Sequence, residues 1–458
     1  MKLNMTLILI TIMLGLLPLN LTASVTHAPH NFNSPDGHAV FVDFKDAIYN
    51  IAYDSSSKSV KAVSILHFEV TEEGLPLFDL IESPIQIILD GENVQNKLIN
   101  TPDNETKLRL IIKNLKPGMH TCEITSPINS GINFLKEGVS SAFWYSDLDD
   151  RSYLEAYLPT NFEFDQYKMI FNIDFKDLTK QKIYSNGKIS QIDDTHFKII
   201  FPETYTSSSA YYHTAPIGRY LESNFTFSSI DGRNIPVTVY KFETIPNLEA
   251  AKNKIIKTLN GLESQYGPFL HQSVTIFLSG SGGMEYCGST MTELWALNHE
   301  LTHSYFARGG FMPANGNAGW IDEAITTWSD EGAESKSDLG SMKSNMAGHS
   351  EYRRYTDDEA YTKGRNFIGH LHYKFQANGG VKSFLNHLIQ NNSFKPMTTE
   401  EFTKKISEFY SEDLSPLFKK YVYDQENEFQ NKPYRMKTDK LKKQVHMKMS
   451  IAEMKKFL

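Results

Sequence analysis

His299-Glu300-Leu301-Thr302-His303 is the stretch of sequence that predicts the fold. Thr290 and Glu293 have the spacing of a capping box and glycines follow at 309 and 310, so residues 291–308 are predicted to form one helix. Residues four apart lie on one face of a helix, so both imidazoles can bind one Zn²⁺ through ring nitrogens. Glu300 lies beside them without being a ligand.

A third protein ligand is needed, because a catalytic zinc ion usually has three protein ligands and one position for water. Glu323 lies 20 positions after His303 in a segment of helical propensity that a loop can fold back against the first helix. Its neighbour Asp322 is the alternative ligand. We predict that His299, His303 and Glu323 hold one Zn²⁺ per chain.

The order of the motifs along the chain is similar to that in the gluzincin zinc aminopeptidases, the family of alanyl aminopeptidase and leukotriene A4 hydrolase. The motifs are Gly283-Met-Glu-Tyr286, the HExxH stretch, Asp322-Glu323-Ala324 and Ala360-Tyr-Thr-Lys-Gly364. Ser152–Asn161, followed by a predicted strand at Tyr167, resembles part of that family's amino-terminal β domain. The chain is expected to be a short form of the family, without a carboxy-terminal helical domain.

The resemblance implies roles for residues outside the metal site. Glu300 becomes the general base, and Glu285, in the family's glycine-x-methionine-glutamate-asparagine motif, would bind the α-ammonium group of the substrate. Tyr361, in the tyrosine-x-lysine-glycine motif, would donate its hydroxyl group to the tetrahedral oxyanion; a core tyrosine at a helix start is the alternative. Asp149 and Asp150 are weak candidates for a second amine anchor.

The sequence departs from the family pattern in ways that affect the predicted substrate pocket. Tyr286 stands where the motif has asparagine, and the spacer between His303 and Glu323 is one residue longer than usual. These differences put the shape of the pocket in question more than the metal site.

Two domains are predicted on either side of residue 236. In residues 29–235, short runs of alternating apolar and polar residues are separated by turns such as Asp90-Gly91, which predicts an antiparallel β domain. Helical spacing begins at Leu248, after a strand. The fold class is therefore α+β, and the resemblance implies that residues 236–425 form a thermolysin-like, mainly helical zinc metallopeptidase domain.

The two ends of the sequence carry their own patterns. Residues 1–28 read as a signal peptide, because Lys2 precedes the apolar run 7–19 and small residues follow. That run is shorter than the roughly 20 residues of a spanning helix, although an uncleaved anchor is the alternative. We therefore expect a secreted or periplasmic protein. Residues 426–458 form a basic tail, for which membrane contact is less favoured than a solvated state.

Composition limits the function. The 458 residues carry a net charge of −8, the wrong sign for a protein that binds nucleic acid. Two cysteines, Cys122 and Cys287, are too few for a four-cysteine zinc site.

We predict a zinc metalloaminopeptidase that removes amino-terminal residues from peptides by attack of a zinc-bound water. A zinc endopeptidase, another zinc hydrolase or a noncatalytic binding protein with this fold are alternatives. Side-chain preference, physiological substrate and oligomeric state do not follow from the sequence.

Overall fold

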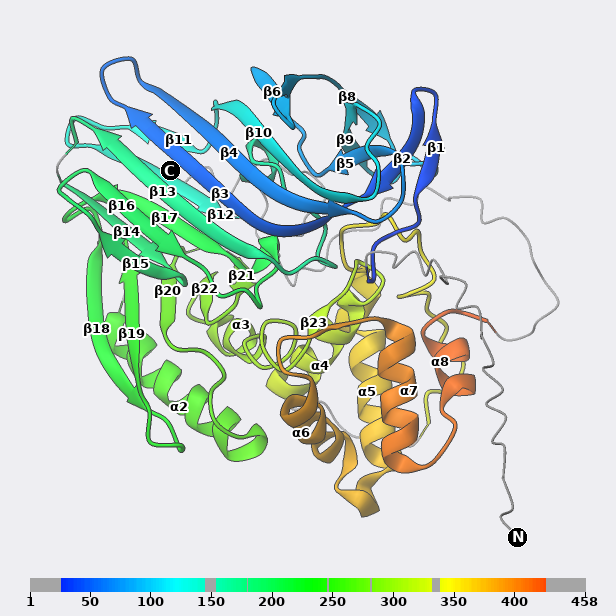
Figure 1. Ribbon diagram of the computed structural model, residues 1–458. Helices are drawn as coiled ribbons and strands as arrows, with labels where there is room; N and C mark the ends of the chain where they lie inside the picture. Colours follow the sequence, from blue (N-terminus) through cyan, green and yellow to red (C-terminus); the bar gives the residue numbers. More distant parts are fainter. Residues whose placement is uncertain are drawn as a thin grey trace, which may run out of the picture.

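The computed structural model (Figure 1) covers most of the chain between the two predicted terminal segments. The residues that the structure describes are 26–144, 154–178, 180–244, 247–280, 282–331 and 338–425. Nearly all of the predicted signal peptide, the basic tail, Asp149 and Asp150 lie outside them. Within the described ranges, no helix combines the length and the apolar character needed to cross a membrane.

Three β-sheets make up the chain as far as residue 216 (Figure 1). The largest has the strand order β15 (Lys188–Gln191), β16 (His196–Ile200), β13 (Lys168–Lys176), β3 (Asp43–Asp54), β4 (Ser59–Val70), β10 (Gly118–Ile128), β6 (Gln86–Leu89) and β7 (Glu92–Asn93). The N-terminal five-stranded sheet has the order β1 (Phe32–Ser34), β2 (Gly37–Phe41), β5 (Leu75–Phe78), β9 (Lys107–Ile112) and β8 (Gln95–Asn100). The third has the order β11 (Ile132–Phe134), β12 (Val139–Trp144), β17 (Tyr211–Pro216) and β14 (Gln181–Ser185). The helical turns α1 (Leu154–Tyr157) and η1 (Ser207–Ser209) connect strands.

The predicted β-rich N-terminal region is confirmed, and its cause is the alternation of side chains. Along β3, Tyr49, Ile51 and Tyr53 are buried while the residues between them are partly exposed, which is the period of a strand with one face on a core. The antiparallel prediction is wrong at two pairings, because β13 pairs with β3, and β2 with β5, in parallel. Long connections between those strands permit this direction.

A fourth β-sheet, of five strands, begins at residue 221. Its strand order is β18 (Leu221–Ser228), β19 (Asn234–Lys241), β20 (Val274–Leu278), β22 (Ser289–Thr292) and β21 (Gly283–Tyr286). The strands β19, β20 and β22 are parallel, and β21 is antiparallel at the edge. The predicted boundary at residue 236 falls inside β19 and stays a prediction.

Seven α-helices follow from residue 248 in the described part of the chain (Figure 1). They are α2 (Leu248–Tyr266), α3 (Leu297–Thr302), α4 (Gly319–Glu331), α5 (Lys363–Lys374), α6 (Gly380–Asn392), α7 (Thr399–Tyr410) and α8 (Ser415–Tyr421). Shorter elements are η2 (Asp358–Tyr361), η3 (Gln376–Asn378), β23 (Met312–Pro313) and β24 (Pro396–Met397). Because the helices share this half with a sheet, a mainly helical domain is not confirmed.

The core of this half fixes the helix that carries Glu323. Trp320, near the start of α4, is fully buried and contacts the rings of Phe367, Phe402 and Phe418. Its indole N–H donates to the hydroxyl group of Thr399 at 3.0 Å. These contacts hold the first turn of α4 in place.

The single helix predicted over residues 291–308 is wrong at both ends. Residues 289–292 form β22, where β-branched Thr290 and Thr292 are buried between two neighbouring strands. The α-helix covers only Leu297–Thr302, and tighter and wider turns follow it, with Ala307 at a φ of 87°. Tertiary pairing of the strand therefore overrides the capping-box spacing.

Candidate metal centre

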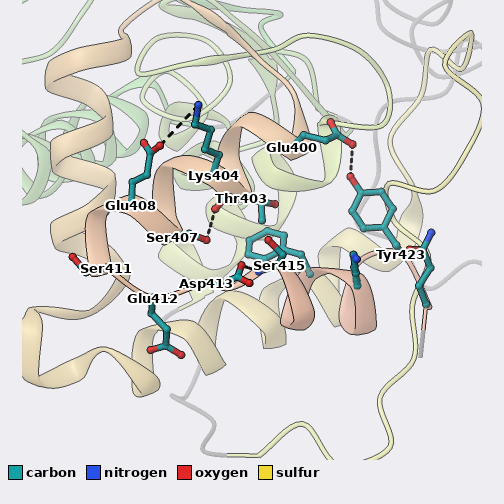
Figure 2. Close-up of a pocket in the computed structure, with 13 residues that line it drawn as sticks. Glu400, Thr403, Lys404, Ser407, Glu408, Ser411, Glu412, Asp413, Ser415 and Tyr423 are labelled. Atoms are coloured by element: carbon teal, nitrogen blue, oxygen red, sulfur yellow. Dashed lines mark hydrogen bonds and ion pairs between the residues drawn. The ribbon is translucent and has the colours of Figure 1, made fainter. Parts of the chain in front are cut away.

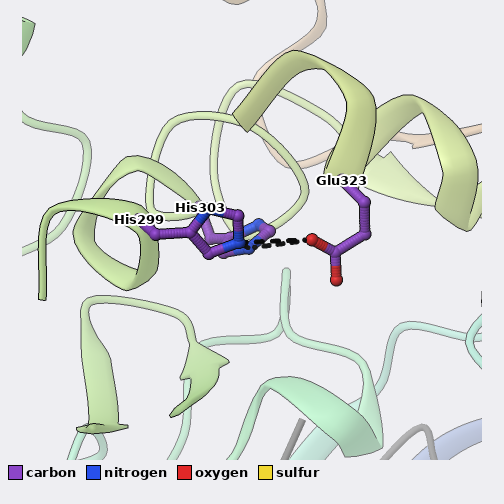
Figure 3. Close-up of side chains that lie close together, drawn as sticks. All are labelled: His299, His303 and Glu323. Atoms are coloured by element: carbon purple, nitrogen blue, oxygen red, sulfur yellow. Dashed lines mark hydrogen bonds and ion pairs between the residues drawn. The ribbon is translucent and has the colours of Figure 1, made fainter. Parts of the chain in front are cut away.

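The two histidines of the HExxH stretch face each other across one turn. His299 lies in α3 and His303 continues the helical path just after it, with φ −57° and ψ −25°. Their Nε2 atoms are 3.1 Å apart (Figure 3). Although the helix is shorter than predicted, the two imidazoles lie side by side, as the four-residue spacing predicts.

Glu323 reaches this pair from α4 (Figure 3). Its Oε2 atom is 3.3 Å from Nε2 of His299 and 3.5 Å from Nε2 of His303. Ligands at zinc's usual bond lengths of about 2.0–2.1 Å in a tetrahedron lie about 3.3 Å from each other. The three side chains therefore fit one zinc ion, with His299 on the more exposed side of the site.

Asp322, the alternative ligand, lies on the other side of the imidazole. Its carboxylate is hydrogen-bonded to Nδ1 of His303, and the Thr326 hydroxyl group is 3.3 Å from the same nitrogen. This arrangement directs Nε2 of His303 toward Glu323, as an orienting partner of a metal ligand does. Burial lowers the pKa of His303, but Asp322, Glu285 and Glu323 outweigh it and raise the pKa. This excess of negative charge suits a divalent cation.

Glu300 lies directly over the edge strand β21. A Cβ atom at Gly283 would clash with Oε1 of Glu300, so a larger residue there has to displace the carboxylate. The carboxylate is nearly buried beside the histidine pair. A glycine in the motif before the HExxH stretch is thus explained by its contact with the candidate base.

Gly283→Ala is expected to retain zinc and to lower turnover about 100-fold, because the added methyl group displaces the Glu300 carboxylate and a shift of about 1 Å at a reacting group can have that effect. Zinc analysis and steady-state kinetics on a peptide substrate measure the two quantities. Gly261→Ala, where the new methyl group meets nothing within 4 Å, is the control and should keep wild-type turnover.

Glu285 lies near the centre but has a partner that the sequence did not reveal. One of its carboxylate oxygens, one of Glu300 and a ring nitrogen of His303 all lie within 4.8 Å of one another. Nη2 of Arg308 donates to Oε1 of Glu285 at 3.1 Å, and Nη1 donates to Oε1 of Glu163 at 2.9 Å. The Arg308 side chain is 1% exposed. Arg308 therefore joins the predicted amine anchor to a second carboxylate.

Tyr361 stands at the end of η2 and completes the group around the metal position. Its hydroxyl group donates to Oε1 of Glu323 at 2.5 Å, and its ring lies nearly parallel to that of His299. Gly364 explains the closeness of the two helices, because a Cβ atom there would be 2.8 Å from Cβ of Ala324. The glycine of the predicted motif lets α5 approach α4.

Other residues singled out in the sequence lie in packed surroundings. Tyr286 points into an aromatic cluster, with its ring 5.1 Å from that of Tyr211. Cys122 and Cys287 are buried and not bonded to each other. Burial raises the pKa of Cys287 to about 12, so it is a poor nucleophile.

Comparison with solved structures identifies the fold of the chain. Legionella pneumophila aminopeptidase A, in complex with aspartic acid, superposes with a TM-score of 0.61 at 15% identity, over 86% of this chain and 50% of that one. An M1 zinc metallopeptidase from Deinococcus radiodurans, bound to Tyr-Ser-Ala, gives 0.60 at 12% identity, over 84% and 94%. Yeast LTA4 hydrolase with bestatin gives 0.60 at 14%, over 86% and 69%. The chain has the fold of the M1 zinc metallopeptidases.

The M1 fold confirms the resemblance predicted from the ordered motifs. It is visible in structure alone, since no protein-family model and no curated protein matches the sequence. The chain spans about half the length of the Legionella protein and nearly all of the Deinococcus enzyme. At 12–15% identity, the likeness to these neighbours is one of fold.

A groove lies between α7 and α8, away from the metal centre (Figure 2). It has a volume of about 690 Å³ and contains none of the predicted site residues. Glu400 accepts a hydrogen bond from the Tyr423 hydroxyl group at 2.6 Å on its wall, and Lys404 lies 3.9 Å from Glu408. The predicted chemistry belongs to the metal centre and not to this groove.

Proposed function

We propose that the protein is a zinc-dependent aminopeptidase that removes amino-terminal residues from peptides. The observation that carries the proposal is the convergence of His299, His303 and Glu323 on one point, at distances that suit the three protein ligands of a catalytic zinc ion. Glu300 and Tyr361 stand at the same point. The second half of the chain is the thermolysin-like catalytic domain in this account.

Each side chain around the metal position has a part in hydrolysis. A bound Zn²⁺ supplies Lewis-acid chemistry, polarising the scissile carbonyl group and making water acidic. Glu300 accepts the proton of the attacking water and passes it to the leaving amine. Tyr361, whose hydroxyl group is held by Glu323, is placed to donate to the developing oxyanion.

Glu285 would make the enzyme an aminopeptidase. Its buried carboxylate lies within a few ångströms of Glu300, where it can pair with an α-ammonium group and place the first peptide bond at the centre. In keeping with the apolar N-terminal segment, we propose that the enzyme acts on peptides after secretion or in the periplasm.

One observation favours a zinc endopeptidase as the second candidate. Arg308 already pairs with Glu285 and lowers the negative charge that an α-ammonium group would meet. An enzyme that cuts within a chain needs no such anchor.

Glu285→Ala separates the two candidates. For an aminopeptidase, the variant should raise KM for free peptides about 10- to 100-fold, because a hydrogen bond to a charged group contributes about 1.5–3 kcal/mol. Its zinc content should not change. Glu285→Gln keeps the size and an acceptor for Arg308, so it controls for packing. An unchanged KM in both variants would favour the endopeptidase.

A further inference from the structure

We propose that residues 343–357, here called the tether loop, transmit the position of the N-terminal five-stranded sheet to Tyr361, with Tyr352 and Asp357 as positioning residues. The inference rests on the proposed function, in which Tyr361 stabilises the oxyanion. It adds a role for the N-terminal sheet in turnover. In Figure 1 the loop lies in the yellow part of the chain, next to β1 and β2.

The outer end of the tether loop is fixed to the sheet by Tyr352. Its ring packs edge-on against Phe32 of β1 at 5.7 Å and parallel to Phe41 of β2 at 6.3 Å. Its hydroxyl group donates to the backbone carbonyl oxygen of His30 at 2.8 Å. Tyr352 thus belongs to the apolar cluster of the N-terminal sheet although it lies more than 300 residues after β1 and β2 in sequence.

A buried ion pair forms a second link to the same sheet. Nη2 of Arg354 lies 3.3 Å from Oδ2 of Asp79, the residue that follows β5. The two side chains are 8% and 0% exposed. Separating such a pair leaves a buried charge without its partner, so the link resists local opening.

Asp357 connects these anchors to η2. Nε2 of His349 lies 3.0 Å and Nη2 of Arg353 lies 3.6 Å from Oδ2 of Asp357. Oδ1 of Asp357 accepts the backbone N–H of Glu359 at 2.9 Å and so caps the 3-10 helix that ends at Tyr361. A displacement of the loop is therefore passed to the first turn that carries the tyrosine.

The inner face of the tether loop packs on the segment that leads into α4. A Cβ atom at Gly316 would be 2.5 Å from the carbonyl oxygen of Arg353, and one at Gly319 would be 2.0 Å from the hydroxyl oxygen of Thr356. The loop is thus held between the N-terminal sheet and the helix of Glu323. The hydrogen bond from Tyr361 to Glu323 connects η2, at the end of the loop, to the same helix α4.

The experiment compares Tyr352→Ala and Asp357→Ala in wild-type and Tyr361→Phe backgrounds. Each variant should lower kcat at least about 10-fold in the wild-type background, since small misplacements of a reacting group are costly, with KM and zinc content unchanged. In the Tyr361→Phe background neither should lower kcat further. The matched control is Tyr410→Ala. It removes a ring that is stacked on Phe375, at 3.7 Å between ring centres, outside the tether loop.

A readout independent of catalysis separates this inference from the proposed function. Hydrogen exchange at residues 358–362 should become faster in Tyr352→Ala, while exchange at residues 297–302 stays at the wild-type rate. Two results would contradict the proposed role of the tether loop. One is unchanged hydrogen exchange at residues 358–362, and the other is that Tyr352→Ala and Asp357→Ala lower kcat equally in the wild-type and Tyr361→Phe backgrounds. An unaltered kcat in Tyr361→Phe alone would instead remove Tyr361 from the proposed mechanism, whatever the exchange rates show.

Discussion

Glu300→Gln is expected to lower kcat by about 10³- to 10⁴-fold, the upper part of the range for a general base, while zinc content stays at one per chain. The amide has the shape of the carboxylate that lies over Gly283 but cannot accept the proton of the attacking water. Zinc analysis and single-turnover kinetics on a free peptide measure the two effects separately.

A matched exchange at another buried glutamate controls for charge and packing. Glu263 is 1% exposed and accepts the backbone N–H groups of Phe269 and Ile230, outside the metal centre. Glu263→Gln should reduce stability and leave kcat unchanged. A Glu300→Gln enzyme with near wild-type turnover would remove Glu300 from the mechanism.

Tyr361→Phe is expected to lower kcat by about 10²- to 10³-fold, or about 2.7–4 kcal/mol, as the loss of one oxyanion donor does. KM for the peptide and zinc content should stay near wild type, because the hydroxyl group interacts with the transition state more strongly than with the bound peptide. Steady-state kinetics over a range of peptide concentrations measure kcat and KM separately.

The control for this variant is a tyrosine that also donates to a carboxylate. Tyr423→Phe removes a hydrogen bond to Glu400 on the wall of the groove between α7 and α8 (Figure 2) and should leave kcat unchanged. If Tyr361→Phe behaved in the same way, Tyr361 would return to the role of a packed residue at a helix start.

The metal centre was predictable because its ligands are set by local spacing. His299 and His303 are one helical turn apart, and the structure brings them together even though the surrounding helix is far shorter than the predicted one. The contact of these histidines with Glu323 depends on the path of a loop. The sequence could therefore predict it only through the order of its motifs, which resembles that of a known family. The choice between Asp322 and Glu323 needed the structure, because both residues contact His303 from opposite sides of the ring.

Contacts between distant segments were not predictable. Arg308 belongs to no motif or periodic pattern in the sequence. Its partners Glu285 and Glu163 come from two different parts of the chain. The alternation of β3 predicted a strand with one buried face, but its parallel pairing with β13 depends on the path of the chain between them. Side-chain patterns report which face is buried, and tertiary contacts decide what covers it.

The most direct test of the account is to follow two peptides of one sequence by mass spectrometry, one with a free and one with an acetylated amino terminus, after incubation with zinc-loaded and with chelator-treated wild-type protein. The account predicts that only the zinc-loaded protein acts, and that the free peptide loses its first residue while the acetylated peptide stays intact. Equal cleavage of both peptides by the zinc-loaded protein, or cleavage that survives complete removal of zinc, would contradict it.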